Sequence, residues 1–502
     1  MNKYVMGIDN GGTATKAAIF DLQGNQIASA GKQTRVITPK SGYTEREMEE
    51  LWNTNCECVA NAIKKSGLNP KEIIGVAVCG HGKGLYPWGK NGAPACNGII
   101  STDSRAWEYP MKWKKEGTDK ALYPKLCQQI MACQQVSLLA WLKDHDRAVY
   151  DNIQWAFSVK DYIRFRLTGE AYSEMTDISG SGLMNVRDAC FDREILVAFG
   201  IGEVYNKLAP LVYSCDLCGK ITKEAAEKTG LREGTPVAGG MFDIDACAIA
   251  MHVTTPEEMC TITGTWSINE FISPRPVTDG TIAMNSLYAI PGYYLEEECS
   301  ATSAGNLEWF LSNCMEGFTP PDGKPLYDYV DEMVESVSPD QCNVYFLPFL
   351  YGSNTHPLGK AAFIGLTQFH NKAHLARAIY EGVAFSHKVH IERLLRARKM
   401  PVTIRMGGGA VNSKVWVQMF ADVLGVPIET IQVKELGALG CAMAAAVAAG
   451  EFQNYQEAVE AMVHIGGTVM PGPCAQKLYQ SKFETYAAVT GALDQVWDRF
   501  EV

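Results

Sequence analysis

The sequence predicts an α/β fold of two lobes with a central cleft. At 502 residues the chain exceeds the size at which one hydrophobic core keeps growing, so two domains are expected. Each half begins with short apolar runs separated by turn residues and continues into segments of helical periodicity. No repeat of roughly 20–50 residues is visible, which argues against a solenoid or propeller.

The first half begins with a β-meander. Short apolar runs alternate with the turn residues Asn10, Gly11 and Gly12 and then Gly24 and Asn25. From residue 45 the apolar residues recur at helical spacing. The spacing predicts strands over 4–8, 16–20 and 73–79, and helices over 48–63, 136–143 and 160–167.

The second half repeats this order of strands followed by helices. It contains a β-rich block over 260–295 and then long helices, the clearest over 374–395 and 415–424. No Gly/Ser linker marks the change, and we place the boundary near residue 247. The predicted domains are therefore residues 1–247 and 248–502.

Composition and charge restrict the class of protein. The net charge is −11, and Lys and Arg form no basic stripe, which argues against a nucleic-acid partner. The N-terminus does not resemble a signal peptide, and no apolar window is long enough to span a membrane. We therefore expect a cytoplasmic protein with no membrane partner. Its 16 cysteines are scattered; Cys215 and Cys218 have metal-site spacing but lack a second pair, so ordinary thiols are expected.

The segment 9–16 is a candidate phosphate-binding hairpin. Gly11 and Gly12 permit a tight turn whose amide groups face an anion, Thr13 adds a hydroxyl, as does the neighbouring Thr15, and Lys16 adds a positive charge. Asp9, at the end of the preceding strand, has the oxygen ligands that Mg²⁺ prefers. A strand follows the turn, unlike the helix of a Walker or Rossmann loop. The alternative is a plain hairpin turn.

Two further glycine turns lie in the second half. Gly264 and Thr265 follow a strand, and a pair of such hairpins could grip a polyphosphate from two lobes. Gly408 and Gly409 precede an amphipathic helix, where bare backbone would let an adenine lie flat, with Asn412 nearby. The alternative for this cluster is a capped helix start. The G-x-G at residues 80–84 is followed by no helix, so we do not assign it a dinucleotide.

Phosphoryl transfer to an alcohol needs a carboxylate near the attacking hydroxyl. Asp243 and Asp245 follow an apolar strand and two glycines, and alternation along an extended segment would place both on one face. The alternative is that Asp243 caps a helix.

With these residues assembled, the chain resembles the FGGY family of carbohydrate kinases over nearly its whole length. Residues 9–13 match the family's first phosphate motif, and 41–47 resemble its P-G-W-x-E-x-D segment. Residues 361–366 together with 374–381 fit its second signature at every position. The first signature is broken, because Leu138 stands where the family has Lys.

This resemblance implies a fold of the actin/Hsp70/hexokinase type (ribonuclease H-like), whose lobes close over ATP and a sugar. It implies ATP and Mg²⁺ as cofactors, Asp243 as catalytic base and Asp9 as the Mg²⁺-linked carboxylate. Gly264 and Thr265 would contact phosphates, Gly305 would border the ribose and α-phosphate, and Gly408 and Gly409 would flank the adenosine. Partners would be a small-molecule sugar and, as is common in the family, a second copy in a homodimer.

Within the family, the segments 82–85, 136–139, 303–310 and 346–354 resemble bacterial kinases of L-xylulose and 3-keto-L-gulonate. His81 and Lys83 would contact the sugar, and Lys83 suits a ketose or a sugar-acid carboxylate; the alternative is a surface lysine. Asp103 and Arg105 would either bind sugar or hold a turn. Alternatives are a polyol (xylitol or erythritol) or D-ketopentose kinase and, in another class, an Hsp70-like or activator-type ATPase.

Overall fold

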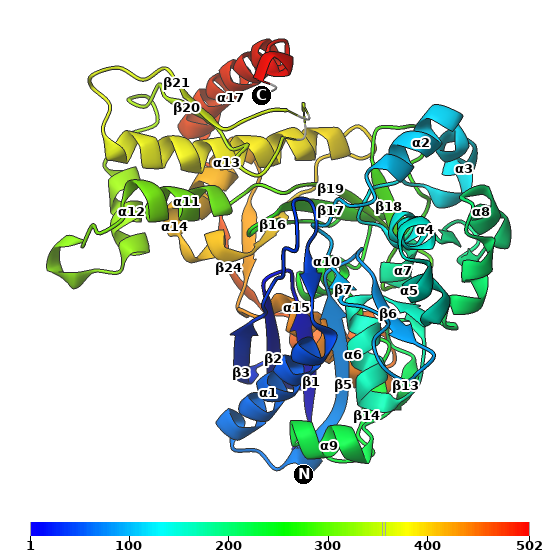
Figure 1. Cartoon of the computed structure of the whole chain (residues 1–502). Coiled ribbons are helices and arrows are strands. Elements are labelled where there is room, and N and C mark those ends of the chain that lie inside the picture. Colours follow the sequence, from blue (N-terminus) through cyan, green and yellow to red (C-terminus); the bar gives the residue numbers. More distant parts are fainter. Residues whose placement is uncertain (1, 354, 357, 501–502) are drawn as a thin grey trace. The chain divides into compact units, whose positions relative to one another are not determined.

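The computed structural model describes residues 2–353, 355–356 and 358–500 and divides into two compact units (Figure 1). The first unit comprises residues 1–255, 272–296 and 433–464, and the second comprises 256–271, 297–432 and 465–502. The predicted domain boundary near residue 247 stays a prediction, because these units are assembled from several segments on both sides of it.

The first unit is built on a mixed sheet. Its strands lie in the order β13-β14-β5-β1-β2-β3, and β15 pairs with β5. The strands β1, β2 and β3 form the predicted antiparallel meander, whereas β5 runs parallel to β1. The bounds are β1 Tyr4–Asn10, β2 Ala14–Asp21, β3 Gln26–Gln33, β5 Ile73–Gly80, β13 Leu217–Lys220, β14 Pro236–Ala238 and β15 Met241–Phe242.

Helices cover both faces of this sheet because side chains alternate along β1. Met6 and Ile8 belong to a buried core that α1 and α6 share, whereas Gly7 faces α15. A Cβ at Gly7 would lie 1.8 Å from the carbonyl oxygen of Ala438, so only glycine admits α15 this closely. The helices are α1 Met48–Ser66, α6 Val159–Thr168, α9 Lys223–Thr229, α10 Asp243–Ala250, α15 Leu436–Ala448 and α16 Tyr455–Met462.

A second core of the first unit forms around shorter elements of residues 86–212. The predicted helices are present here and alternate with short strands. The helices are α2 Glu108–Glu116, α3 Thr118–Leu126, α4 Gln135–His145, α5 Arg147–Asn152, α7 Met175–Ser179 and α8 Arg193–Ala198. The strands are β4 Glu45–Arg46, β6 Tyr86–Gly89, β7 Gly98–Ile99, β8 Ile153–Phe157, β9 Ser173–Glu174, β10 Met184–Asn185, β11 Cys190–Phe191 and β12 Leu211–Val212.

The second unit has its own sheet, in which β19-β17-β16-β22-β23-β24 are neighbours in that order. The β16–β17 hairpin confirms the second predicted strand–turn–strand. The strands are β16 Met259–Thr263, β17 Ser267–Ser273, β19 Tyr294–Ser300, β20 Tyr345–Leu347, β21 Ala362–Ile364, β22 Ile404–Gly407, β23 Ile428–Ile431 and β24 Ile465–Val469; β18, Met284–Leu287, lies in the first unit. The helices are α11 Gly305–Cys314, α12 Leu326–Glu335, α13 Lys372–Leu394, α14 Lys414–Leu424 and α17 Pro473–Asp494.

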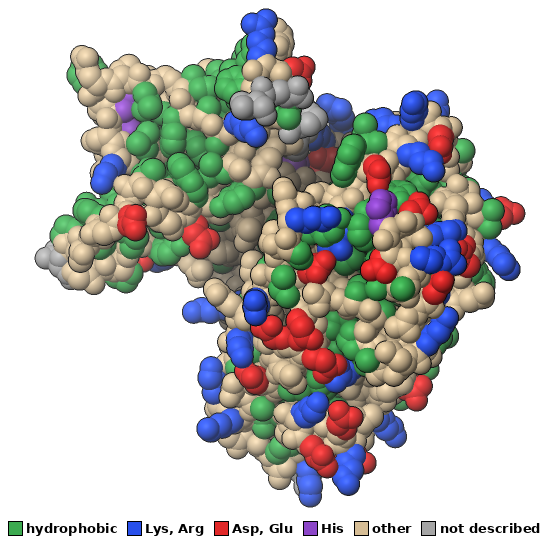
Figure 2. Space-filling view, viewed as in Figure 1, with side chains coloured by type: hydrophobic (Ala, Val, Ile, Leu, Met, Phe, Trp, Pro, Cys, Tyr) green, Lys and Arg blue, Asp and Glu red, His purple; other side chains and the backbone are tan. Residues whose placement is uncertain are grey.

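On the face shown in Figure 2, Lys and Arg side chains are interspersed with Asp and Glu. Within the described part of the chain, no helix combines the length and the apolar composition that crossing a bilayer requires.

Candidate active site

The first glycine hairpin lies between β1 and β2, as predicted. Asn10 pairs with Thr15 across it, and residues 11–13 form the turn. Arg46 of β4 is buried beneath the turn and donates to the carbonyl oxygens of Gly11 and Gly12. These bonds occupy the carbonyl groups and leave the turn able to present its amide groups to an anion. Arg46 lies in the 41–47 segment that resembles a family motif, but no role was predicted for it from the sequence.

Thr15 does not join that turn. Its side chain is buried and its Oγ1 donates to Asn10 Oδ1 at 3.1 Å, so the expected second hydroxyl donor points inward. Alternation along β2 explains the error, since Thr15 and Lys16 necessarily face opposite sides of the strand. Lys16 Nζ lies 2.9 Å from Glu435 Oε2, just before α15.

Asp9 is the penultimate residue of β1, and its carboxylate lies against the first turn of α15. A Cβ at Gly437 would lie 2.7 Å from Asp9 Oδ2, so a glycine is needed for this approach. Asp9 Oδ1 is buried and has no hydrogen-bond partner among the described residues. Burial raises the pKa of Asp9 to about 6, although the Cys79 thiol and the Lys16 ammonium oppose the shift. A desolvated carboxylate with a free oxygen is suited to binding a cation.

Asp243 is the first residue of α10, after the turn that follows β14. The expectation of an extended segment was wrong: residues two apart on a helix point in nearly opposite directions, so Asp243 and Asp245 do not share a face. Asp245 is buried and its Oδ1 accepts a hydrogen bond from Ala289 N at 3.1 Å. Asp243 is partly exposed, and the N-cap position of α10 belongs to Phe242, so the capping alternative for Asp243 does not apply.

The charge of Asp243 is sensitive to its surroundings. Burial raises its pKa well above the ordinary value, and the negative charges of Asp9 and Asp177 raise it further, while Lys83 opposes them. Asp243 therefore lies within electrostatic reach of both Asp9 and Lys83. A carboxylate with a raised pKa is a stronger base than an exposed aspartate.

His81 and Lys83 lie on the loop after β5. His81 is buried, and burial lowers its pKa to about 3, so the imidazole is neutral. Its Nδ1 donates to the Gly82 carbonyl at 3.2 Å, and its Nε2 accepts from the Tyr86 hydroxyl at 2.9 Å. Lys83 has a φ of 63°, uncommon for a residue with a side chain, and its Nζ lies 5.7 Å from the centre of the Phe242 ring. Such backbone strain is typical of functional loops.

The carboxylate of Asp103 is buried and joins two neighbouring loops. Its Oδ2 accepts from Thr44 N at 2.7 Å, and both carboxylate oxygens lie within 3.0 Å of Arg105 Nε. Arg105 also bonds Glu45 at 2.7 Å. This arrangement supports the turn-holding alternative, while sugar binding by Asp103 stays a prediction.

The second unit contains a cavity of about 530 Å³. This volume suits a nucleoside-sized ligand. The cavity gathers the residues predicted to hold the nucleotide, namely Gly264, Thr265, Gly305, Gly409 and Asn412, and it also includes Asp331, Tyr380, Ser413 and Trp416.

One wall of this cavity is aromatic. The rings of Tyr380 and Trp416 stack with centroids 4.1 Å apart, and Tyr380 Oη donates to Asp331 Oδ1 at 2.8 Å. Ser413 Oγ donates to the same oxygen at 2.7 Å. Sequence reasoning missed Asp331 and assigned no role to Tyr380 or Trp416, although Tyr380 lies in the second family signature.

Gly408 does not line the cavity, although its neighbour Gly409 does. The φ of Gly408 is 89°, and a Cβ there would lie 2.5 Å from the carbonyl oxygen of Thr263. The glycine therefore allows the loop after β22 to pack against the end of β16. At Gly409 and Gly264 a Cβ would meet nothing within 4 Å, so the backbone there borders open space.

The donor set fits Mg²⁺ better than a protein-caged metal. No group of three or more His, Cys, Asp or Glu side chains in the described ranges could hold an ion. Mg²⁺ commonly uses one or two carboxylates and completes its shell with water and substrate phosphates. The free oxygen of Asp9 meets that requirement. Cys215 and Cys218 are unbridged, and burial raises the pKa of Cys218 to about 11.

Comparisons with known proteins show the family to which the chain belongs. Residues 4–250 match the N-terminal domain of the FGGY family of carbohydrate kinases, and residues 259–449 match its C-terminal domain. The chain is 36% identical over 495 residues to the L-xylulose/3-keto-L-gulonate kinase of Escherichia coli (strain K12), covering 98% of each chain. It is 35% identical over 491 residues to a probable L-xylulose kinase of Pasteurella multocida (strain Pm70), covering 98% of this chain and 99% of that one.

A solved structure shares the fold. Ligand-bound xylulose kinase from Lactobacillus acidophilus matches with a TM-score of 0.88 at 24% identity, covering 99% of this chain and 100% of the other. The predicted family resemblance and the predicted α/β fold of the actin type are confirmed.

Proposed function

Because the chain belongs to the FGGY family of carbohydrate kinases, we propose that it phosphorylates a primary hydroxyl of a small ketose, L-xylulose or 3-keto-L-gulonate. Family membership makes it a sugar kinase, a phosphotransferase with an alcohol acceptor. The choice of ketose is supported by the names of the E. coli and P. multocida relatives. The polyol, D-ketopentose and ATPase alternatives are not favoured.

The observation that carries the mechanism is Asp243, a partly exposed carboxylate whose pKa is raised by burial and by Asp9. Asp243 accepts the proton of the sugar hydroxyl as the hydroxyl oxygen attacks the γ-phosphorus of ATP. The bond from that phosphorus to the bridging oxygen breaks, and ADP leaves. Protonation of Asp243 removes the base, so kcat falls on the acid side of the pH profile.

ATP supplies the phosphoryl group, and the cavity of the second unit is its proposed site. The open backbone at Gly409 leaves room for adenine, and the buried Tyr380–Trp416 stack supports this part of the cavity lining. Gly305 begins α11, where amide groups at the helix N-terminus suit a phosphate. In the first unit, the turn at Gly11, Gly12 and Thr13 provides further amide donors.

Asp9 is the residue proposed to hold Mg²⁺. The bound ion would neutralise charge on the phosphate oxygens. Asp9 has the free buried oxygen for this contact, and Gly437 leaves room beside its carboxylate. The Lys16–Glu435 pair keeps a cation near Asp9 without occupying that oxygen.

Lys83 and His81 are the residues proposed to recognise the sugar. The Lys83 ammonium pairs with the carboxylate of 3-keto-L-gulonate or donates to the hydroxyls of L-xylulose. Neutral His81 holds the loop through Gly82 and Tyr86. We also expect a homodimer, as the family resemblance implies, and a cytoplasmic location, as the N-terminal sequence suggests.

The substrate proposal is tested with a panel of sugars in a coupled ADP-release assay. The panel contains L-xylulose, 3-keto-L-gulonate, D-xylulose, xylitol and erythritol. We expect the highest kcat/KM for one of the first two. Turnover of alditols alone, or ATP hydrolysis that does not depend on sugar, would overturn the proposal.

The proposed base is tested with Asp243→Asn. Loss of a general base lowers kcat by roughly 10²–10⁴-fold, while ATP binding measured by calorimetry should be unchanged. Asp144→Asn is the control, because it removes another carboxylate of the first unit, one that accepts only from Tyr109 Oη among the bonds resolved. Full turnover by Asp243→Asn would show that another group takes the proton.

A further inference from the structure

A group of charged side chains is buried beside the turn that carries Asp243. Two are cations, Lys160 and Arg164 of α6, and three are carboxylates, Asp161, Glu174 and Asp177. Their side chains are at most 3% exposed. Burying charge has a large desolvation cost, and apolar residues of similar volume often stabilise a fold as well or better. Stability alone therefore does not explain this cluster.

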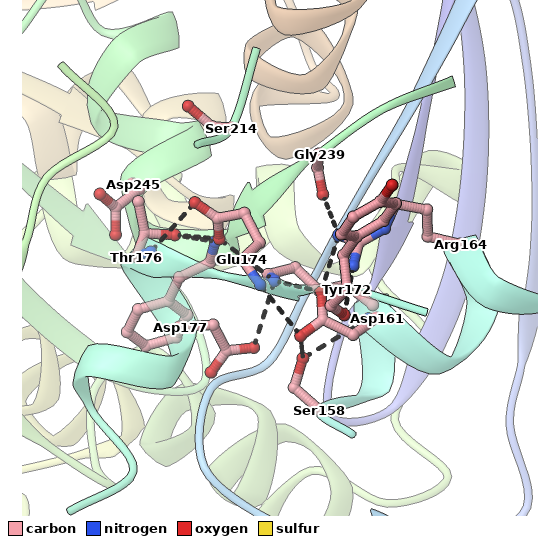
Figure 3. Close-up of polar contacts among 12 residues, drawn as sticks. Ser158, Asp161, Arg164, Tyr172, Glu174, Thr176, Asp177, Ser214, Gly239 and Asp245 are labelled. Carbon is pink, nitrogen blue, oxygen red and sulfur yellow. Dashed lines mark hydrogen bonds and ion pairs between the residues drawn. The ribbon is translucent and has the colours of Figure 1, made fainter. Parts of the chain in front are cut away.

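Lys160 is the centre of the cluster. Its Nζ lies 2.9 Å from Asp161 Oδ1, 3.1 Å from Glu174 Oε2 and 4.0 Å from Asp177 Oδ2. Arg164 Nη1 lies 2.8 Å from the same oxygen of Asp161. Figure 3 shows the resulting network of contacts converging from α6, β9 and α7.

The cluster reaches the Asp243 turn at two points. Arg164 Nη1 donates to the Gly239 carbonyl at 2.6 Å, at the start of the turn. Thr176 Oγ1 accepts from the backbone N–H of Phe242 at 2.8 Å, at its end. Thr176 in turn donates to Glu174 Oε2 at 2.7 Å (Figure 3). The residue directly before Asp243 is thus tied through Thr176 and Glu174 to Lys160.

The turn has little freedom between those two points. Gly240 has a φ of 77°, and a Cβ there would lie 1.9 Å from the carbonyl oxygen of Val78. A Cβ at Gly239 would lie 2.2 Å from the carbonyl oxygen of Tyr213. The backbone is therefore enclosed on both sides. The pairing of β15 with β5 and the hydrogen bond from Phe242 N to Thr176 Oγ1 hold the residue from which Asp243 continues. A general base must be held to within about half an ångström of its productive position.

We propose that Thr176 is a positioning residue for Asp243, and that the Lys160–Glu174 ion pair holds the Thr176 hydroxyl in place. This inference rests on the proposed role of Asp243 as the base. Thr176 touches no reacting atom; it fixes the backbone of Phe242 and through it the carboxylate of Asp243. The cluster supplies rigidity that a flexible apolar contact would not.

The test compares three variants of the full chain. Thr176→Val keeps the shape but removes the hydroxyl, and Thr176→Ser keeps the hydroxyl. Thr229→Val is the matched control: Thr229 is as buried as Thr176, donates to Ala225 O at 2.6 Å and accepts from Leu231 N at 3.3 Å.

We expect Thr176→Val to lower kcat about 10–100-fold, since small displacements of a reacting group have effects of this size. KM for sugar and for ATP should stay within about twofold, because neither substrate is contacted. Thr176→Ser should restore kcat, and Thr229→Val should lower Tm as much as Thr176→Val without lowering kcat. Wild-type kcat in Thr176→Val, or an equal loss of kcat in Thr229→Val, would overturn the inference.

Glu174→Gln provides a second measurement if Thr176→Val does not fold. This variant weakens both the hydrogen bond that the Thr176 hydroxyl donates and the Lys160–Glu174 ion pair. We expect kcat to fall again while KM does not change. An unchanged kcat would contradict the inference. Asp243→Asn separates this inference from the proposed function. If Asp243→Asn is inactive and Thr176→Val is fully active, only the positioning role fails.

Discussion

The two units support their functional loops with different buried polar groups. In the first unit, the ion cluster around Lys160 lies beside the turn that presents Asp243. In the second unit, the buried polar support is a neutral histidine. His387 of α13 lies between the β16–β17 hairpin, which carries Gly264, and the segment that leads to Gly305.

The contacts of His387 are all uncharged. Its Nδ1 lies 2.9 Å from Asn269 Oδ1 and 2.9 Å from Thr261 Oγ1, and its Nε2 lies 3.0 Å from Ser303 Oγ. Since Asn269 Oδ1 is only an acceptor, Nδ1 carries the proton and Nε2 accepts from Ser303. Burial lowers the pKa of His387 well below its ordinary value, so the ring stays neutral.

The two kinds of support differ in what a substitution leaves behind. In the first unit the support consists of buried ion pairs, so the loss of one member leaves a buried charge without its partner, whereas in the second unit it consists of neutral hydrogen bonds. The two regions should therefore respond differently to substitution and to pH.

The largest effect is expected for Lys160→Met. Removing the central cation leaves Glu174 and Asp177 without their buried partner, and losses of about 3–5 kcal/mol are typical of a broken buried pair. Unfolding by urea should show this loss. Lys125→Met, which removes an exposed lysine paired with Asp192, should lose far less. Equal losses would mean that the cluster is no more important than a surface pair.

His387→Phe should have a smaller effect. The substitution leaves the buried hydroxyl of Ser303 and the amide of Asn269 with fewer hydrogen-bond partners. We therefore expect the free energy of unfolding to fall by about 2–4 kcal/mol. KM for ATP should rise, because the hairpin and the start of α11 lose their common support. The exposed His145→Phe is the control.

The difference in the free energy of unfolding between the wild type and His387→Phe should become smaller at acid pH. Below about pH 6.5 the unfolded chain protonates His387 while the native state keeps it neutral. The unfolded wild-type chain then binds one more proton than the native state, so the wild type loses stability as pH falls. The Phe variant has no imidazole at this position and does not lose stability in this way. A difference between the two proteins that is constant from pH 5 to 8 would contradict a neutral native His387.

Asp177→Asn should stabilise the protein. Asp177 Oδ2 is buried with no hydrogen-bond partner in the described part of the chain, and burial raises the pKa of Asp177 to about 7. Between about pH 4 and 7 the native state holds a proton that the unfolded chain has released, so wild-type stability falls as pH rises. The free energy of unfolding of the variant should therefore exceed that of the wild type by an amount that grows over this pH range to about 1–3 kcal/mol and then levels off. A variant less stable than the wild type at pH 8 would show that the attraction of Lys160 Nζ, 4.0 Å from Asp177 Oδ2, outweighs the cost of burying the carboxylate.

Gly409→Ala should have the smallest effect on stability. Its Cβ meets nothing within 4 Å, so we expect a change of less than about 0.5 kcal/mol. KM for ATP should rise, because the methyl group enters the cavity. Gly408→Ala is the contrast, since its backbone and the Thr263 carbonyl exclude a Cβ. Equal Tm values for both variants would contradict the packing described here.

Much of the fold was predictable because it is local. Short apolar runs identified β1, β2 and β5, and glycine turns identified both hairpins. Long periodic segments identified α1, α13 and α14, with differences of a few residues at their ends. The start of α10 was missed, because the glycines before Asp243 obscure the helical period.

The candidate site was predictable only in part. Glycine turns and isolated carboxylates pointed to Asp9, Asp243, Gly264 and Gly409. Arg46, Asp331 and Thr176 gave no comparable signal, because an arginine, an aspartate or a threonine is ordinary on a surface and becomes informative only when it is buried against a particular partner. Asp103 was predicted either to bind sugar or to hold a turn, but its bond with Thr44, 59 positions away, could not be read from the sequence.

The sequence by itself determined the α/β class, the two glycine hairpins and the family, since each depends on patterns of neighbouring residues. Only the tertiary structure decided that α15 returns to the first unit against Gly7, that Thr15 faces inward, and that Thr176 bonds the residue before Asp243. The physical reason is that hydrogen bonds and ion pairs in a core join positions far apart in the chain, and no local pattern encodes which of them meet.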